Sequence, residues 1–73
     1  MEPVLYTMDG CLSCFKAKQY LIQSNIYFIE KNLFTDLNAA LEIKDLLGEV
    51  TAPVFVDGAF ILKGSDILRI ERK

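Results

Sequence analysis

The sequence predicts an α/β domain built on a four-stranded mixed sheet that is covered by helices on both faces. Three observations favour this fold class. Strand-like and helix-like segments follow one another along the 73 residues in the order β-α-β-α-β-β-α. Several strand-like segments are apolar at consecutive positions, as strands covered on both faces are. Hydrophobic residues make up 52% of the chain, which suits the efficient core that a single domain of this size needs.

The first half of the chain predicts two strands joined by a helix. Val4-Leu5-Tyr6-Thr7 is an apolar, β-branched and aromatic run that ends before Asp9-Gly10, and it predicts a buried strand. Residues 13–24 contain no Gly or Pro and carry apolar residues at helical spacing, which predicts an amphipathic helix. Residues 26–30 predict the second strand. Because a helix links the two strands, we expect them to lie parallel through a right-handed crossover.

The second helix is predicted from a cap, an apolar stripe and a stop signal. Thr35 and Asp36 are residue types that cap helix N-termini, and Gly48 suits the left-handed position that ends a helix. The stripe between them consists of Leu37, Ala40, Leu41, Lys44 and Leu47.

The last part of the chain predicts a hairpin followed by a short helix. Residues 54–56 and 59–62 are apolar and flank Asp57-Gly58, a dipeptide typical of two-residue type I′ turns. The hairpin adds two antiparallel strands to the parallel pair, which makes the sheet mixed. Ser65 or Asp66 can cap the final helix. Its apolar residues are Ile67, Leu68 and Ile70.

The two cysteines of the chain, Cys11 and Cys14, lie between the first predicted strand and the first predicted helix. This placement puts Cys11 at the helix N-terminus, where free backbone N–H groups and the helix dipole favour a thiolate. Cys14 then lies one turn inside the helix, close enough to form a disulfide with Cys11. The pattern predicts a dithiol redox site.

Two other uses of the cysteine pair remain open. A metal site or an iron–sulfur cluster needs ligands from a second chain or an outside thiol, because this chain has two cysteines and no histidine. The cysteines could also be inert, half-buried side chains. A disulfide that only staples the fold is disfavoured, since such a short loop contributes only about 2 kcal/mol.

Charge and composition exclude other classes of function. The net charge is −2, with acidic and basic residues interleaved, so no basic stripe for nucleic acid is predicted. The apolar stretch from Val4 to Met8 is too short for a signal peptide or a membrane span. We therefore expect one domain over residues 1–73, without a membrane or nucleic-acid partner, that works as a monomer in a reducing cytosol.

Pro53 follows Thr51-Ala52 and directly precedes a predicted strand. A cis Ala52-Pro53 bond would expose the backbone of Ala52, as a docking edge for an extended thiol substrate. The alternative is a loop proline that only starts a strand, and most X–Pro bonds are trans. The proline taken by itself favours this alternative.

Three motifs occur in a fixed order along nearly the whole chain. They are Gly10-Cys11-Leu12-Ser13-Cys14 with Lys16-Ala17-Lys18 after it, then Thr51-Ala52-Pro53-Val54 about 40 residues later, then Lys63-Gly64-Ser65-Asp66. Together they resemble the glutaredoxin family of the thioredoxin fold. The resemblance implies a cis Pro53, with Cys11 and Pro53 facing each other at one end of the sheet. It also implies the strand order second, first, third, fourth.

The resemblance further implies thiol–disulfide exchange. Cys11 would attack a substrate disulfide as a thiolate, and Cys14 would resolve the mixed disulfide. The implied partners are a disulfide-containing protein or a small thiol, with a reductase as electron donor. No tightly bound cofactor and no metal is implied, and glutathione or another thiol is the implied co-substrate. The implied thiol-binding residues are Thr51, Ala52, Pro53, Gly64, Ser65 and Asp66.

Two departures from the family pattern concern the electron donor. Leu12-Ser13 stand where glutathione-using members carry Pro-Tyr, and Met8-Asp9 stand where those members carry a lysine for a glutathione carboxylate. The Ala-Pro-Val run at residues 52–54 is also similar to glutaredoxin-like proteins that serve ribonucleotide reductase and are recharged by thioredoxin reductase. Both glutathione and thioredoxin reductase therefore remain open as donors.

We expect from these residues a small thiol–disulfide oxidoreductase. Tyr6 and Phe15 are interpreted as packing residues, and Lys16 and Lys18 either add positive charge beside the thiols or form an ordinary solvated helix face. Two alternatives use the same cysteines. One is a redox sensor that controls a partner, and the other is an iron–sulfur or metal-binding module.

Overall fold

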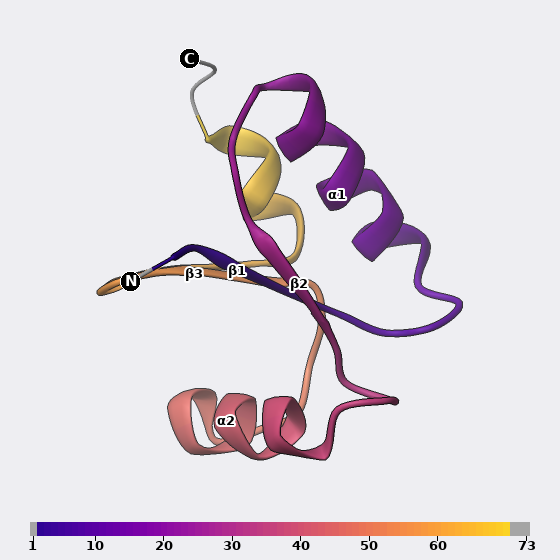
Figure 1. Ribbon diagram of the computed structural model, residues 1–73, viewed down its shortest axis with the longest axis vertical. Helices are drawn as coiled ribbons and strands as arrows, with labels where there is room; N and C mark the ends of the chain where they lie inside the picture. The colour runs from indigo at the N-terminus through magenta and orange to yellow at the C-terminus, as the bar shows by residue number, and fades with distance from the viewer. Residues whose placement is uncertain (1, 71–73) are drawn as a thin grey trace.

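A single four-stranded mixed sheet forms the centre of the protein, and helices cover both of its faces (Figure 1). The structure is a computed structural model that describes residues 2–70. The elements in chain order are β1 (Val4–Thr7), α1 (Leu12–Gln23), β2 (Ile29–Asn32), α2 (Leu37–Leu47), β3 (Val54–Asp57), β4 (Phe60–Lys63) and the 3₁₀ helix η1 (Gly64–Arg69).

The strand order is β2-β1-β3-β4, which confirms the predicted topology. β1 runs parallel to β2, with Thr7 opposite Asn32. β3 is antiparallel to both β1 and β4. Because parallel strands end at the same edge of a sheet, the loop that follows β1 meets the last residues of β2. This edge holds the two cysteines.

The sheet buries one hydrophobic cluster on each face. In Figure 1, α1 and η1 lie on one side of the sheet and α2 on the other. Leu5 and Tyr6 are neighbours in β1, and they point to opposite faces because side chains alternate along a strand. The cluster beneath α1 and η1 contains Leu5, Ala17, Leu21, Phe55 and Ile67. The cluster beneath α2 contains Tyr6, Leu33, Ala39, Ile43 and Val54.

The second strand begins three residues later than predicted, at Ile29 instead of Ile26. Asn25 has a φ of +60°, and the Ile26 N–H donates to the Leu21 carbonyl at 3.0 Å, so the chain is still closing α1 at this point. Ile26 and Phe28 pack against the cluster beneath α1 without belonging to a strand. These residues are apolar because they are partly buried against the core. An apolar run in the sequence looks the same whether its residues pair in a strand or only pack against the core.

The ends of α2 are the predicted ones. Asp36 is the N-cap, and its side chain accepts a hydrogen bond from the Ala39 N–H at 3.1 Å. Gly48 has a φ of +81° and ends the helix, a conformation that an L side chain adopts only with strain.

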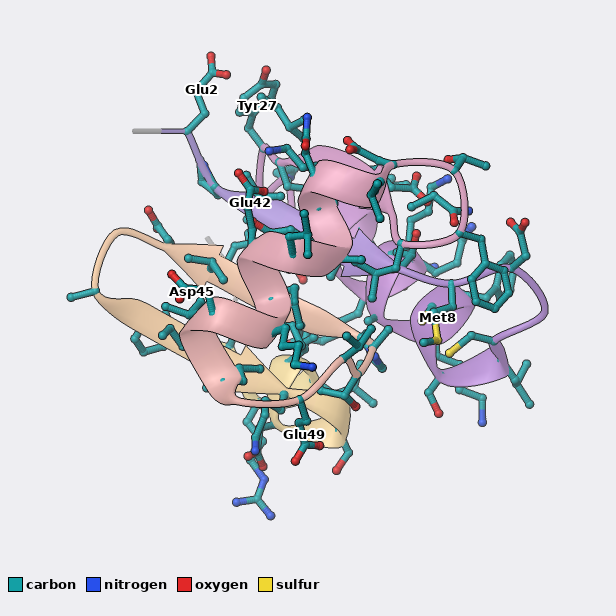
Figure 2. All side chains as sticks on the ribbon, turned by 90° about the horizontal axis from the view of Figure 1, so that it is seen from below. Glu2, Met8, Tyr27, Glu42, Asp45 and Glu49 are labelled. Carbon is teal, nitrogen blue, oxygen red and sulfur yellow. The ribbon has the colours of Figure 1, made fainter. Side chains whose placement is uncertain are left out.

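The buried face of α2 differs from the predicted stripe. Ala39 and Ile43 are fully buried, whereas Leu37 and Leu41 are 74% and 58% exposed. Figure 2 shows α2 lying across the sheet, with Glu42 and Asp45 on it. Ala39 and Ile43 lie four positions apart and so share one face of the helix. The packing of this face against Tyr6, Leu33 and Val54, not the number of large apolar residues, decides which face is buried.

The hairpin turn lies one residue further along than predicted. Asp57 pairs with Phe60, so the two turn residues are Gly58 and Ala59, not Asp57 and Gly58. Gly58 has a φ of +62° and Ala59 does not have a positive φ. A positive φ at only the first turn residue is typical of a type II′ turn, so the predicted type I′ turn is wrong.

The final helix is a 3₁₀ helix that begins at Gly64, earlier than either predicted cap. Its N-cap position is Lys63, which makes no side-chain capping hydrogen bond, so the expected cap by Ser65 or Asp66 is wrong. The Gly64 N–H donates a hydrogen bond to the Pro53 carbonyl at 2.9 Å. This bond holds the point at which β4 ends and the 3₁₀ helix begins. The Ala52-Pro53 bond is cis, as the resemblance implied.

Candidate active site

Cys11 occupies the N-cap position of α1, where the sequence predicted it. Its backbone is extended, with φ −93° and ψ 108°, and Gly10 before it has a φ of +73°, which turns the chain from β1 into the helix. The Cys14 backbone N–H donates to the Cys11 Sγ at 3.1 Å. The sulfur thus takes the place of the usual capping oxygen. A donor N–H and the positive end of the helix dipole both favour negative charge on Cys11.

Cys14 lies one turn further along and is 3% exposed. Burial, followed by a hydrogen bond with Cys11, raises the pKa of Cys14 to about 11, while the Met8 backbone N–H acts in the opposite direction. Cys14 is therefore a thiol at neutral pH. Both cysteines are reduced in this structure, and Cys11 is the more exposed of the two. The same motif thus holds one accessible sulfur and one shielded sulfur.

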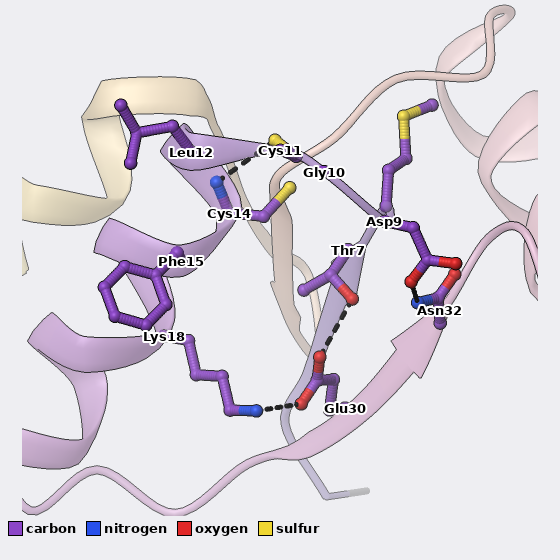
Figure 3. A pocket seen from close by; sticks show the side chains of 11 residues that line it. Thr7, Asp9, Gly10, Cys11, Leu12, Cys14, Phe15, Lys18, Glu30 and Asn32 are labelled. Atoms are coloured by element: carbon purple, nitrogen blue, oxygen red, sulfur yellow. Dashed lines mark hydrogen bonds and ion pairs between the residues drawn. The ribbon is translucent and has the colours of Figure 1, made fainter.

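An open pocket of about 430 Å³ lies beside the two sulfurs (Figure 3). We call it the cysteine pocket; it is formed by Thr7, the loop at residues 8–11, the first two turns of α1, and Glu30 and Asn32 of β2. Leu12 and Phe15 line it and are 66% and 57% exposed. Phe15 therefore borders the site, which corrects its interpretation as a packing residue, whereas Tyr6 is buried as expected.

The wall of the cysteine pocket contains an ion pair between α1 and β2. The Lys18 Nζ lies 2.7 Å from one oxygen of Glu30, and the Thr7 hydroxyl donates to the other oxygen at 3.0 Å (Figure 3). The hydrogen bond from Lys18 outweighs burial and lowers the pKa of Glu30, so the carboxylate is charged at neutral pH. Lys18 is thus neither a purely solvated residue nor a free positive charge.

Sequence reasoning missed both residues that β2 contributes to this pocket. Glu30 is the partner of Lys18, and the Asn32 side-chain amide donates to the Asp9 carboxylate at 2.7 Å. A polar Glu30 after the apolar run Ile26-Tyr27-Phe28-Ile29 was the signal that could have found the first of them. The place of Asn32 in the pocket could be found only from the strand register, which puts Asn32 beside Thr7.

The predicted thiol-binding residues lie in three places. Gly64 and Ser65 line a small hollow of about 190 Å³ together with Ser13 and Lys16 of α1. These two predicted residues therefore lie next to the start of the helix that carries the cysteines. Gly64 is also tied to Pro53 by its backbone hydrogen bond. Thr51, Ala52, Pro53 and Asp66 do not line this hollow.

Asp66 is not brought to the hollow that Gly64 and Ser65 line. It lines a separate surface hollow with Phe60, Arg69 and neighbouring apolar residues. Ala52 packs against the cluster beneath α2, Pro53 is buried, and Thr51 is half-buried.

Within residues 2–70, no group of three or more His, Cys, Asp or Glu residues is arranged to hold a metal ion. None of the helices described is both long and apolar enough to cross a membrane.

The glutaredoxin family model matches residues 4–61 of this chain. Among solved structures, the glutaredoxin from Brucella melitensis superposes with a TM-score of 0.73 and 26% identity, covering 94% of this chain and 75% of that one. The glutaredoxin-like protein NrdH-redoxin from Escherichia coli superposes with a TM-score of 0.80 and 23% identity. The superposition covers 97% of this chain and 96% of that one. The fold is thus the thioredoxin-like fold that the sequence predicted.

The curated relatives are of a different kind. The global transcriptional regulator Spx of Bacillus subtilis is 42% identical over 43 residues, and Spx 1 of Oceanobacillus iheyensis is 44% identical over 43 residues. Each match covers 59% of this chain and 33% of the relative. This chain therefore matches about a third of the length of these regulators.

Proposed function

The chain belongs to the glutaredoxin family, and on this basis we propose that it is a dithiol oxidoreductase in which Cys11 attacks and Cys14 resolves. One observation carries the proposal: the Cys11 sulfur accepts the Cys14 N–H at the start of α1, while Cys14 itself is buried and protonated. This asymmetry supports one nucleophile and one reserve thiol, which is what a two-step exchange requires.

The reaction has two steps that balance without an outside oxidant. The Cys11 thiolate attacks one sulfur of a substrate disulfide; a mixed disulfide forms, and the other substrate sulfur leaves with the electron pair. Cys14 then loses its proton and attacks the Cys11 sulfur, so the Cys11–Cys14 disulfide forms and the second substrate thiol is released. The substrate gains two electrons, and a reductase restores the dithiol.

Substrate contacts are proposed on both sides of Cys11. Leu12 and Phe15 offer exposed apolar surface at the cysteine pocket, suited to a protein or peptide disulfide. Thr51-Ala52-Pro53 remains the proposed docking edge, and Gly64 and Ser65 the proposed half-site for glutathione, with Lys16 beside them. Asp66 lines another hollow, so its part in binding glutathione has less support.

The setting of this activity is part of the same proposal. We propose a monomer in a reducing compartment such as the cytosol, where a dithiol pair of this kind stays reduced and catalytic. Glutathione or another small thiol serves as co-substrate, and the proposed protein needs no tightly bound cofactor. Neither a nucleic acid nor a membrane is among the proposed partners.

A coupled recycling assay tests the proposal and identifies the electron donor. One reaction supplies glutathione with glutathione reductase, the other supplies thioredoxin reductase, and NADPH consumption is followed in both with a disulfide substrate present. We expect turnover in at least one reaction and its loss in Cys11→Ser. Activity with glutathione would assign the half-site at Gly64 and Ser65 a working role.

Activity with thioredoxin reductase alone would mean that Asp9 and Met8, which stand where glutathione-using members carry a lysine, weaken glutathione binding. Lack of turnover in both reactions, with wild-type protein shown to be folded and reduced, would contradict the proposed enzyme.

The curated relatives favour a second candidate, a redox sensor. Seven regulators named Spx match part of this chain at 41–46% identity. In this role the Cys11–Cys14 disulfide would change the surface around the cysteine pocket instead of passing electrons rapidly to a substrate. Hydrogen exchange of the oxidised and reduced protein separates the two roles. A sensor predicts slow turnover with altered protection beyond the motif, whereas an enzyme predicts fast turnover with changes confined to residues near it.

A further inference from the structure

The cysteine pocket carries an ion pair for which the two-step exchange described above assigns no role. Its charged side chains, apart from the cysteines, are Asp9 from the loop after β1, Lys18 from α1 and Glu30 from β2. Asp9 accepts a hydrogen bond from Asn32, whereas Glu30 is held by Lys18 and by the buried Thr7. Two bonds from different elements thus fix the Glu30 carboxylate in the wall of the pocket that Cys14 also lines.

The surroundings of Cys14 change when the mixed disulfide forms. In the reduced protein, burial, the hydrogen bond with Cys11, the charge of Cys11 and the charge of Glu30 all raise the pKa of Cys14. Two of these causes belong to Cys11, and both end once its sulfur is bound to a substrate sulfur. Burial and the Glu30 carboxylate then remain to oppose ionisation of Cys14.

We propose that the Lys18–Glu30 ion pair controls the resolving step, with Glu30 opposing the Cys14 thiolate and Lys18 offsetting that carboxylate. Both are positioning residues, because they act through Cys14. The proposal rests on the proposed function, since it assigns a regulator to the second step of that reaction. Its consequence is that the ion pair sets how long a partner stays covalently attached to Cys11.

The step itself involves only groups already named. The Cys14 S–H bond loses its proton to solvent, and the new thiolate attacks the Cys11 sulfur. The bond between Cys11 and the partner sulfur breaks, and the partner leaves with the electron pair and takes up a proton. A negative charge beside Cys14 lowers the fraction of thiolate and slows this step, and a positive charge has the opposite effect.

Two substitutions change the local charge in opposite directions. Glu30→Gln removes the negative charge, can still accept the Thr7 hydrogen bond, and leaves Lys18 unpaired. Lys18→Met removes the positive charge and leaves Glu30 unpaired. We expect the resolving step at neutral pH to become faster in Glu30→Gln and slower in Lys18→Met, on the order of threefold each. Its pH profile should move to lower pH in the first variant and to higher pH in the second.

A single rapid-mixing experiment measures both steps. Reduced protein is mixed with an equal amount of a symmetric chromogenic aryl disulfide, which releases one coloured thiol when Cys11 attacks and a second when Cys14 resolves. The first phase reports the proposed function and the second phase reports this inference. In Cys14→Ser the second phase must be absent, which assigns the two phases.

The matched control is the other ion pair of the described residues. Lys31 and Glu42 lie 3.2 Å apart, and Glu42 also accepts a hydroxyl hydrogen bond, from Tyr6, as Glu30 does from Thr7. Neither Lys31 nor Glu42 lines the cysteine pocket, so Glu42→Gln should leave both phases unchanged.

The directions in which the two substitutions change the rate of the second phase decide the outcome. A faster second phase in Glu30→Gln supports the inference. If Glu30→Gln does not fold, a slower second phase in Lys18→Met supports the inference when its pH profile also moves to higher pH. Equal rates, or slowing in both variants with an intact first phase, would show that the pair only holds α1 to β2 and would overturn the inference alone. Loss of the first phase in the wild-type protein would overturn the proposed function and the inference with it.

Discussion

Cys11 and Cys14 have the same side chain but differ in reactivity because of their positions in the fold. Cys11 stands at the N-cap of α1 with a backbone donor at 3.1 Å, and Cys14 lies one turn inside the helix at 3% exposure. Free N–H groups at a helix start stabilise an anion, and burial penalises one. The division of labour between nucleophile and resolving thiol therefore follows from local structure and does not need a histidine.

The raised pKa of Cys14 predicts a pH-dependent stability. The thiol ionises near 9.0 in the unfolded chain and at about 11 in the folded protein, so the unfolded state loses its proton first as the pH rises. The free energy of unfolding of the reduced protein should be unaffected below pH 9 and fall between pH 9 and about 11, by roughly 2–3 kcal/mol. Urea unfolding at a series of pH values measures this.

Other groups titrate in the same range, and burial also raises the pKa of Tyr6. The comparison that isolates Cys14 is therefore the difference between wild type and Cys14→Ala. Parallel pH profiles for the two proteins would show that Cys14 ionises equally readily in the folded and unfolded states.

At this scale the sequence identified the chemistry but not its surroundings. Cys11 and Cys14 could be predicted because a strand, two close cysteines and a helix are consecutive in the chain. The partners of Glu30 could not, because its hydrogen bond to Thr7 spans 23 positions and depends on the register of β1 with β2. The hollow beside Gly64 and the separate position of Asp66 likewise depend on how η1 packs against α1.

The type and order of the elements were predictable from the sequence, and two of the differences between prediction and structure share one cause. The late start of β2 and the rotated face of α2 both reflect tertiary packing that overrides a local apolar pattern. Ile26 is apolar because it packs against the core, and Leu41 is apolar although it lies on the surface. The hairpin differs for a local reason, because the pairing of Asp57 with Phe60 moves the turn by one residue.

The observed face of α2 gives a direct stability test. Ile43→Ala should destabilise the protein by about 2–5 kcal/mol, because it leaves a cavity beneath a fully buried side chain. Leu41→Ala deletes an apolar side chain from the same helix at an exposed position and should cost less than about 1 kcal/mol. Chemical denaturation of both variants measures the difference. Equal losses would contradict the observed face, and a larger loss in Leu41→Ala would mean that the predicted stripe faces the sheet.

At the scale of the whole molecule, the architecture could be predicted from the sequence, but the partner could not. The strand order β2-β1-β3-β4 was implied by the family resemblance, and the structure confirms it. The family model matches residues 4–61, whereas the curated regulators match over about a third of their own length. Glutaredoxins and the Spx regulators are thus both similar to parts of this chain, and its partners must be identified by measurement.

The central claim is that Cys11 attacks and Cys14 resolves, and intact mass spectrometry after acid quenching tests it most directly. Reduced wild type, Cys11→Ser and Cys14→Ser are each treated with glutathione disulfide. We predict that Cys14→Ser accumulates one glutathione adduct at Cys11, that Cys11→Ser stays unmodified over the same time, and that wild type loses two hydrogens as its internal disulfide forms. Equal adducts on both variants, or an adduct on Cys11→Ser alone, would contradict the account.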